Sequence, residues 1–333
     1  MIEVTDLTKR FADKVAVDHL SFTVEPGRVT GFLGPNGAGK STTMRLIVGL
    51  DHPTSGSATI DGKRYAELPS PLRTVGALLE AKSVHSGRSA RNHLLFLAQS
   101  QGLPPSRVDE MLDLVGLREV AKKRAGGFSL GMGQRLGVAA ALLGDPEVLL
   151  LDEPVNGLDP EGVLWIRNLM KQLASQGKTV LVSSHLMNEM AVTADHLIVI
   201  GRGKLLAAAS TDEVIARGSG QSVRVRTPDA DRLTELITAE GGSAVPASNG
   251  NGNGNGTESG DHAPVLTVTG VPAARIGELA ASAQIVLHEL TPQLATLEDA
   301  FLELTAGSLE FGHANTGPAG TEAAAQPEQE SVR

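Results

Sequence analysis

A glycine-rich stretch near the N-terminus carries the strongest chemical signal in the sequence. Gly34, Gly37, Gly39, Lys40 and Ser41 fit the pattern G-x-x-x-x-G-K-[ST]. Glycines at these positions let consecutive backbone N–H groups converge on phosphate oxygens without a side chain in the way. The lysine would reach the terminal phosphates, and the serine hydroxyl would hold Mg²⁺. The pattern therefore predicts a cradle for a bound polyphosphate.

A pair of carboxylates follows an apolar run much further along the chain. The run 147–151, EVLLL, ends in Asp152 and Glu153. Carboxylates at the C-terminal end of a parallel strand lie beside such a cradle in a doubly wound sheet. We predict that Asp152 binds Mg²⁺ and that Glu153 orients and polarises the water that attacks the γ-phosphate. His185 follows another apolar strand, so we expect it at the same edge, in contact with the γ-phosphate.

An aromatic side chain and a second helix start are weaker candidates. Phe11 and Val17 could form the flat apolar surface on which an adenine ring stacks, although a phenylalanine that covers a strand end is an equally good interpretation from spacing alone. Ser129 is a plausible N-cap, and Gly131 and Gly133 in the turns that follow are poor helix formers. A second helix N-terminus that faces phosphate explains all three, and an ordinary capped helix is the alternative.

Composition limits the class of protein. The chain has 333 residues, a net charge of -9 and no cysteine. This length favours one large domain with a smaller one, and the acidic balance argues against a nucleic-acid partner. A chain without cysteine has no disulfide framework and no thiolate site, which suits a reducing compartment. No run of eighteen apolar residues occurs, and the N-terminal segment is charged, so we expect neither a membrane span nor a signal peptide.

The hydrophobic pattern changes character along the chain. Antiparallel strands are expected before and after Phe11, and a mostly helical insert is expected over 90–143. Beyond residue 217, alternating strand and helix patterns resemble a split βαβ sandwich, with strands at 222–226, 243–245, 265–269 and 285–289 and helices at 229–239, 273–283 and 296–305. The predicted domains are 1–216 and 217–311, with a flexible insert at 246–262 and a disordered tail at 312–333.

Five motifs, taken in order, resemble those of an ABC transporter nucleotide-binding domain. GPNGAGKST looks like Walker A, FSLGMGQR like the signature, VLLLDEP like Walker B, NGLD like the D-loop and SSH like the switch-histidine segment. The SLGM form, the LLE segment and the C-terminal TPQLATLEDAFLELT resemble the daunorubicin- and bacitracin-resistance branch of export ATPases. The resemblance implies an α/β P-loop NTPase of the ABC ATPase type, with a RecA-like core and antiparallel β and helical subdomains, followed by a small α+β ferredoxin-like C-terminal domain.

The same resemblance implies a homodimer that binds ATP and Mg²⁺, with each ATP between Walker A of one subunit and the signature helix of the other. The implied catalytic residues are Glu153 and His185, and the implied D-loop residue is Asp159. The implied ATP-binding residues are Phe11, Val17, Gly34, Pro35, Asn36, Gly37, Ala38, Gly39, Lys40, Ser41 and Thr42, with Ser129, Leu130, Gly131 and Met132 acting across the interface. The implied Mg²⁺ ligands are Ser41 and Asp152, and Glu80 is a further candidate.

Three positions depart from the family pattern. Leu130 stands where the signature usually has glycine, and Met132 stands where it usually has glutamine. Glu80 replaces the glutamine that senses Mg²⁺ and contacts the membrane subunit, which adds negative charge near the triphosphate and changes a donor into an acceptor. A solvated acid at a strand end is the alternative interpretation of Glu80.

The leading hypothesis is the ATPase subunit of an ABC-2 type exporter, bound to the cytoplasmic side of the cell membrane through a separate transmembrane permease. A drug-like, antibiotic or lipid substrate follows from family analogy alone. The first alternative is a soluble ABC ATPase that acts on the ribosome or DNA, but such proteins usually carry two cassettes or a coiled-coil insert, and a basic surface. The second is an importer ATPase, against which the exporter-like C-terminal extension weighs.

Overall fold

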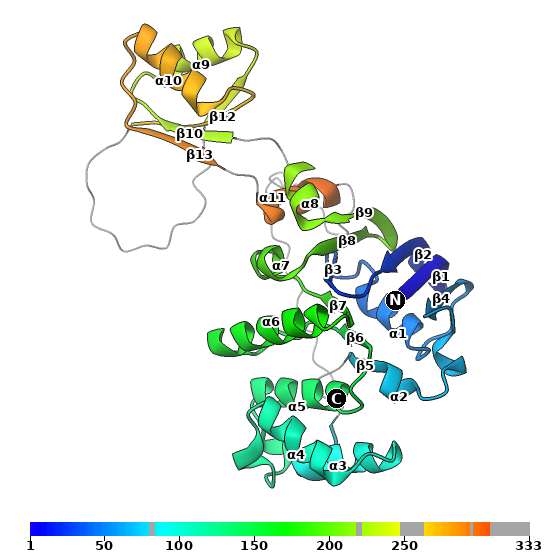
Figure 1. Cartoon of the computed structure of the whole chain (residues 1–333). Helices are drawn as coiled ribbons and strands as arrows, with labels where there is room; N and C mark the ends of the chain where they lie inside the picture. Colours follow the sequence, from blue (N-terminus) through cyan, green and yellow to red (C-terminus); the bar gives the residue numbers. More distant parts are fainter. Residues whose placement is uncertain (80–83, 218–221, 247–262, 294–295, 307–333) are drawn as a thin grey trace, which may run out of the picture.

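A six-stranded sheet forms the centre of the protein (Figure 1). The computed structural model describes residues 1–79, 84–217, 222–246, 263–293 and 296–306. The order of the sheet is β5-β6-β7-β3-β8-β9. The first five strands in this order run parallel, and β9 pairs antiparallel with β8. Its strands are β3 (Val29–Leu33), β5 (Val75–Leu78), β6 (Val148–Leu151), β7 (Thr179–Ser183), β8 (His196–Gly201) and β9 (Lys204–Ser210).

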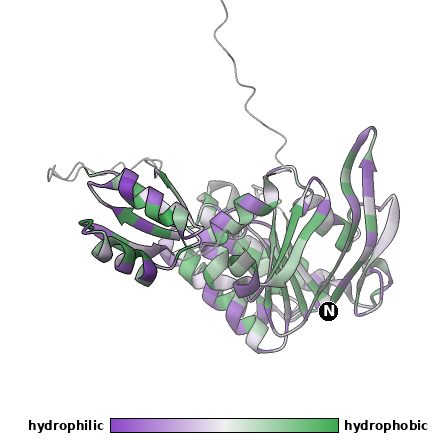
Figure 2. Ribbon diagram, turned by 90° about the horizontal axis from the view of Figure 1, so that it is seen from above, coloured by the Kyte–Doolittle hydropathy of each residue, from purple (hydrophilic) through white to green (hydrophobic). Residues whose placement is uncertain are grey.

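The middle strands are mostly apolar because both faces of the sheet are covered. Every residue of β3, β6 and β7 is buried. Along β6, Leu149 and Leu151 belong to one hydrophobic core, whereas Val148 and Leu150 belong to another on the opposite face. Figure 2 shows the apolar residues concentrated on these central strands. The continuous apolar runs of the sequence are therefore the strands that bring distant motifs to one edge.

Two smaller units flank this sheet. The first is an antiparallel sheet of order β2-β1-β4, and the second is a group of helices that pack on one another beyond β5 (Figure 1). Both match the expected antiparallel strands and helical insert. The elements concerned are β1 (Ile2–Phe11), β2 (Lys14–Val24) and β4 (Ser55–Ile60), with α3 (Ala90–Ser100), α4 (Pro105–Leu114) and α5 (Leu130–Leu142). The other helices of this body are α1 (Lys40–Ile47), α2 (Pro71–Thr74), α6 (Pro160–Ser175), α7 (Met187–Thr193) and α8 (Thr211–Arg217).

The C-terminal unit has the expected ferredoxin-like arrangement. Its elements follow the order β-α-β-β-α-β, and its four strands form an antiparallel sheet of order β11-β12-β10-β13. A separate hydrophobic core lies between this sheet and its two helices. The elements are β10 (Ser222–Arg226), α9 (Ala230–Ala239), β11 (Ser243–Pro246), β12 (Val265–Thr269), α10 (Ala273–Ser282) and β13 (Glu289–Gln293).

One predicted strand is misplaced. The apolar pattern predicted a strand over 285–289, but the paired strand β13 starts at Glu289 and continues to Gln293. Ile285 is buried in the core of the unit, in the connection that follows α10. An apolar side chain can be buried without its backbone pairing with a neighbouring strand. The apolar pattern therefore indicated the buried connection before β13 and not the strand itself.

The last helix, α11 (Leu297–Thr305), does not pack with the C-terminal unit that precedes it. Leu297 and Ala300 are buried in the core of the large body that contains the six-stranded sheet, where α11 contacts α7 and α8 (Figure 1). The sequence grouped this helix with the C-terminal sandwich, but its buried residues lie in the core of the large body. The chain leaves the large body after α8 and returns to it at α11. The boundaries at 216 and 311 stay a prediction.

Some expectations concern residues outside the described part of the chain. These are the tail at 312–333, the predicted insert at 246–262 apart from Pro246, and Glu80. Among the described residues, no helix is both long and apolar enough to cross a membrane.

Candidate functional site

The glycines of the loop between β3 and α1 are required by close backbone contacts. Gly37 and Gly39 have φ values of +82° and +104°. A Cβ on Gly39 would lie 2.4 Å from the carbonyl oxygen of Ala16, and one on Gly34 would lie 2.6 Å from that of Ile200. No side chain fits at either place without a shift of the backbone. The loop is thus held in a tight turn directly before the first residue of α1.

Lys40, the first residue of α1, is only 8 % exposed and lies inside this loop. Its Nζ atom donates hydrogen bonds to the carbonyl oxygens of Gly34, at 2.5 Å, and Pro35, at 3.3 Å. Burial lowers the pKa of Lys40, while the negative charges of Glu153 and Asp152 act to raise it. The ammonium group is therefore held near the cradle, opposite two carboxylates.

The carboxylates lie where β6 ends, and β7 lies between β6 and β3. The backbone N–H of Asp152 donates to the carbonyl oxygen of Leu78, 2.7 Å away, which fixes the start of the turn. The register pairs Leu151 with Val182 and Phe32 with Ser183, so that the ends of three parallel strands meet. This is the position that a doubly wound sheet offers to ligands.

Glu153 is anchored at several points. Its φ is +50°, which is unusual for a residue other than glycine. The N–H group donates to Ser183 Oγ at 2.9 Å, and the carbonyl oxygen accepts from Gln134 Nε2 at 3.2 Å. The side-chain oxygen Oε2 lies 2.7 Å from His185 Nδ1. His185 therefore lies at the same edge of the sheet as Glu153, where the sequence placed it, and its direct contact with Glu153 is an addition of the structure.

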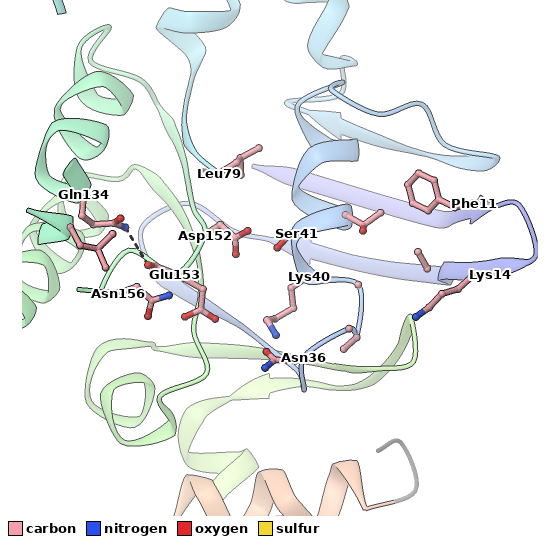
Figure 3. A pocket seen from close by; sticks show the side chains of 16 residues that line it. Phe11, Lys14, Asn36, Lys40, Ser41, Leu79, Gln134, Asp152, Glu153 and Asn156 are labelled. Atoms are coloured by element: carbon pink, nitrogen blue, oxygen red, sulfur yellow. Dashed lines mark hydrogen bonds between the residues drawn. The ribbon is translucent and has the colours of Figure 1, made fainter. Parts of the chain in front are cut away.

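These groups surround a cavity of about 730 Å³ (Figure 3). This volume is within the usual range for a ligand site. In Figure 3, Lys40 and Ser41 point from α1 toward the side on which Asp152 and Glu153 lie. The lining residues are Phe11, Lys14, Ala16, residues 36–42, Leu79, Leu130, Gln134, Asp152, Glu153 and Asn156.

At the end of the cavity away from the acids lies Phe11. Its side chain is 47 % exposed, and Lys9 Nζ lies 4.8 Å from the ring centroid. An exposed ring in a cavity wall fits a stacking surface better than a cover for a strand end. Val17, the predicted second half of that surface, is fully buried in the core, and Ala16 lines the cavity in its place. The strand alternates sides, so the residue one position earlier faces the cavity.

The signature segment divides between two places. Leu130 lines both the cavity and a neighbouring hollow of about 480 Å³, whereas Ser129 and Gly133 line that hollow alone. Ser129 Oγ accepts a hydrogen bond from the N–H of Met132, which confirms the expected N-cap of α5. Neither Gly131 nor Met132 belongs to the cavity lining.

Gly131 and Gly133 of the signature differ in whether packing within the chain requires a glycine. A Cβ on Gly131 would lie 2.8 Å from the carbonyl oxygen of Gly157 in the same chain, so internal packing already demands a glycine there. A Cβ on Gly133 would meet nothing within 4 Å. The interpretation that an external group approaches both glycines is therefore needed only at Gly133.

Asp159, the predicted D-loop residue, has a structural role. Asp159 caps α6, with Oδ1 accepting from the N–H of Gly162 at 2.9 Å. Sequence reasoning quoted Ser183, Gln134 and Asn156 only as letters of the SSH, FSLGMGQR and NGLD motifs and gave none of them a role. In the structure Gln134 is buried, and a buried polar side chain must find a partner.

Comparison with known proteins agrees with this geometry. The ABC transporter family model matches residues 17–156, and a domain of unknown function matches residues 221–298. An uncharacterized ABC transporter ATP-binding protein, YhcH of Bacillus subtilis, is 35% identical over 314 residues, which cover 93% of this chain and 97% of that protein. The chain belongs to the ABC transporter ATP-binding proteins. The fold class predicted from the motifs is confirmed.

Two further similarities refine this assignment. The bacitracin transport ATP-binding protein BcrA of Bacillus licheniformis is 43% identical over 220 residues, covering 65% of this chain and 72% of that protein, which confirms the resemblance to the bacitracin branch. A dimeric ATP-binding cassette in a post-hydrolysis state, bound to ADP and phosphate, superposes with a TM-score of 0.58 at 24% identity, over 63% of this chain and 99% of that one. As a member of this family, the ABC protein described here is an ATPase.

Proposed function

We propose that the ABC protein is the ATPase subunit of an exporter, in which two copies close around ATP and drive a separate membrane permease. The observation that carries this proposal is the division of the signature segment. The cavity holds the phosphate loop and the two acids, but Ser129 lies in another hollow of the same chain. One copy thus has the phosphate loop and the two acids at its own cavity, and a second copy would supply Ser129 and the start of α5.

The exposed start of α5 supports this dimer. The helix has 13 residues, and its first N–H groups and positive dipole end favour an anion. Open space above Gly133 leaves room for a group from outside the chain. Ser129, Leu130, Gly131 and Met132 would then face the triphosphate held by the Walker A loop of the partner. The structurally similar cassette that is described as dimeric, with ADP and phosphate, agrees with this arrangement.

A magnesium ion fits the residues at the cavity. Within the described parts of the chain, no three His, Asp or Glu side chains gather to form a metal cage of protein ligands alone. Mg²⁺ in nucleotide sites usually has one or two protein ligands and takes the rest from phosphates and water. Ser41 and Asp152 both line the cavity and would be these ligands. The ion would neutralise charge on the phosphate oxygens.

The remaining steps of nucleotide binding and hydrolysis would be carried out by side chains at the cavity. Glu153 would accept a proton from the attacking water and orient it, and Lys40 would stabilise the negative charge of the phosphates. His185, held by Glu153, would contact the γ-phosphate. Phe11, with Ala16 beside it, would stack on the adenine ring.

A membrane partner follows from the transport family. No described helix is long and apolar enough to cross a membrane, and the proposal of a separate permease rests on the transport relatives. The relative BcrA is a bacitracin transport protein, which supports an antibiotic or a similarly amphiphilic compound as the exported substrate. The protein would then lie on the cytoplasmic face of the cell membrane.

Co-expression with the membrane protein encoded beside it tests this function. We expect the two proteins to co-purify from detergent, and we expect inverted vesicles that contain both to accumulate labelled bacitracin when ATP is added. The control is the same pair with the Glu153→Gln variant. A protein that instead co-purifies with ribosomes or DNA, and whose turnover does not respond to the membrane protein, would support the soluble ABC ATPase alternative.

A further inference from the structure

Ser183 occupies a position at which the three chemically important strands meet. It is the last residue of β7 and is fully buried. Its own backbone pairs with Phe32, the penultimate residue of the strand that leads into the phosphate loop. Its side chain reaches the end of β6, the other neighbouring strand, which is followed directly by the two acids. A hydroxyl group in such a place must satisfy its hydrogen bonds within the protein.

The hydroxyl of Ser183 makes two hydrogen bonds, and their directions are fixed. The backbone N–H of Glu153 can only donate, so Ser183 Oγ accepts there, at 2.9 Å. The single proton of the hydroxyl is then free to be donated to Asp152 Oδ1, 2.5 Å away. One atom therefore connects both acids.

The bond to Glu153 supports a conformation that the residue would otherwise avoid. With φ at +50°, Glu153 is in the left-handed region, which is unfavourable for a side chain with a Cβ. Ser183 holds the N–H side of this residue, and Gln134 holds its carbonyl side. Without the first contact the backbone is free to relax, and the carboxylate at the end of a flexible side chain would move with it.

The bond to Asp152 acts on the second acid. A donor on Oδ1 fixes the rotation of the carboxylate and leaves the other oxygen for a cation or its water. Hydrogen bonds of this kind to metal-ligating carboxylates orient the ligand and commonly change metal affinity or activity about 10- to 100-fold when they are removed. Ser183 does not line the cavity, so it acts only through its two neighbours.

We infer that Ser183 is a positioning residue that orients both acids of the site through one hydroxyl: Asp152 toward the metal and Glu153 toward the attacking water. This inference deepens the proposed function and rests on its magnesium site. Ser183 has no contact of its own with nucleotide or metal in this role. A purely structural serine would satisfy buried groups and affect stability alone.

Variants at 182 and 183 separate these two roles. Ser183→Ala removes both hydrogen bonds, and Ser183→Thr restores a hydroxyl at the same atom. Val182→Ala is the matched control, because Val182 is the preceding residue of β7, is fully buried and faces the hydrophobic core instead of the acids. Should Ser183→Ala fail to fold, Ser183→Cys keeps a side chain of similar size with a much weaker donor and carries the same expectation.

The experiment measures ATP turnover as a function of Mg²⁺ concentration in the full-length protein. For Ser183→Ala we expect a half-maximal Mg²⁺ concentration raised about tenfold and a kcat lowered about tenfold. Nucleotide binding in the absence of metal should be unchanged, because the loop around Lys40 is intact. Ser183→Thr should recover both values, and Val182→Ala should lower the melting temperature while it keeps the Mg²⁺ profile.

A second measurement does not depend on turnover. Mn²⁺ bound together with a non-hydrolysable ATP analogue, observed by electron paramagnetic resonance, should show weaker binding in Ser183→Ala and normal binding in Ser183→Thr. The inference is overturned if Ser183→Ala keeps the wild-type Mg²⁺ profile and Mn²⁺ affinity, or if Val182→Ala changes them equally. Absence of turnover in the wild-type protein would count against the proposed function, and the Mn²⁺ measurement would still decide the role of Ser183.

Discussion

Nδ1 of His185 lies 2.7 Å from Oε2 of Glu153, across the ends of the neighbouring strands β7 and β6. This contact holds the side chain of the acid, while Ser183 and Gln134 hold its backbone on either side. Glu153 is therefore fixed at three points that come from two segments of the chain, the end of β7 and α5. Such fixation is what a group that orients a water molecule requires, because a misplaced base loses much of its catalytic effect.

Glu153→Gln should separate binding from hydrolysis. The amide keeps the size of the side chain and can still contact His185, but it cannot accept a proton from water. We expect ATP affinity to be retained and turnover to fall by about 10²- to 10⁴-fold, the usual contribution of a general base. Light scattering with ATP should then show a stable dimer. Normal turnover in this variant would mean that another group acts as the base.

Lys40→Ala should weaken nucleotide binding. The buried ammonium group is the positive charge that the phosphate loop encloses, and a hydrogen bond to a charged group contributes about 1.5–3 kcal/mol, or roughly 10- to 150-fold in affinity. Fluorescent ATP analogues measure this loss directly. Lys171→Ala, which removes an exposed lysine of α6, is the control. Unchanged affinity in Lys40→Ala would remove the loop from the mechanism.

Nucleotide affinity should also fall at alkaline pH earlier than an ordinary lysine would require. Burial lowers the pKa of Lys40, so the group loses its proton below the usual lysine range, and with it the attraction for phosphate. The effect on folding stability has the opposite sign. The buried charge of Lys40 is unfavourable for folding below the lowered pKa, and this cost disappears as the pH rises from the lowered pKa toward the ordinary lysine pKa.

The neighbouring acids give this pH dependence an internal check. Glu153 raises the pKa of Lys40 through its negative charge, so Glu153→Gln should move the alkaline loss of affinity to still lower pH. Titrations of nucleotide binding in the wild-type protein and in Glu153→Gln measure the displacement, and Lys40→Ala should lack this transition. A displacement to higher pH would contradict the electrostatic account.

Leu297→Ala should destabilise the large body although residue 297 follows the C-terminal unit in the chain. Leu297 is 2 % exposed and lies in the core that α11 shares with α7 and α8. Truncation of a buried leucine typically costs about 2–5 kcal/mol. Thermal or urea unfolding, monitored together with nucleotide binding, measures this cost. Leu302→Ala, at a position 54 % exposed on the same helix, should change stability by less than about 0.5 kcal/mol. Equal effects of the two changes would mean that α11 is not packed as described.

The parts of the site that sequence could predict are those set by local backbone geometry. The glycines before Lys40 are needed for positive φ values and close approaches, and such demands leave a recognisable spacing in the chain. The apolar runs before Glu153 and His185 marked buried parallel strands, and their carboxyl ends had to meet at one edge. Ser129 was identified as a helix cap for the same local reason.

Other predictions needed the packed structure. Val17 and Ala16 are neighbours in sequence, and only the register of β2 decides which one faces the cavity. The glycine requirement at Gly131 comes from the carbonyl of Gly157, which no local pattern reveals. The sequence of an amphipathic helix such as α11 indicates which face is apolar but not which surface covers that face. The position of α11 against α7 and α8 therefore could not be predicted from its sequence.

The amino-acid sequence by itself thus predicted a phosphate-binding loop and determined where the acids and the histidine stand along the chain, because each of these depends on a few consecutive residues. Only the tertiary structure decided that one hydroxyl, on Ser183, joins Asp152 to Glu153, 31 and 30 residues away in sequence. Hydrogen bonds between strands depend on register and on the directions of side chains, and both are set when the whole sheet packs.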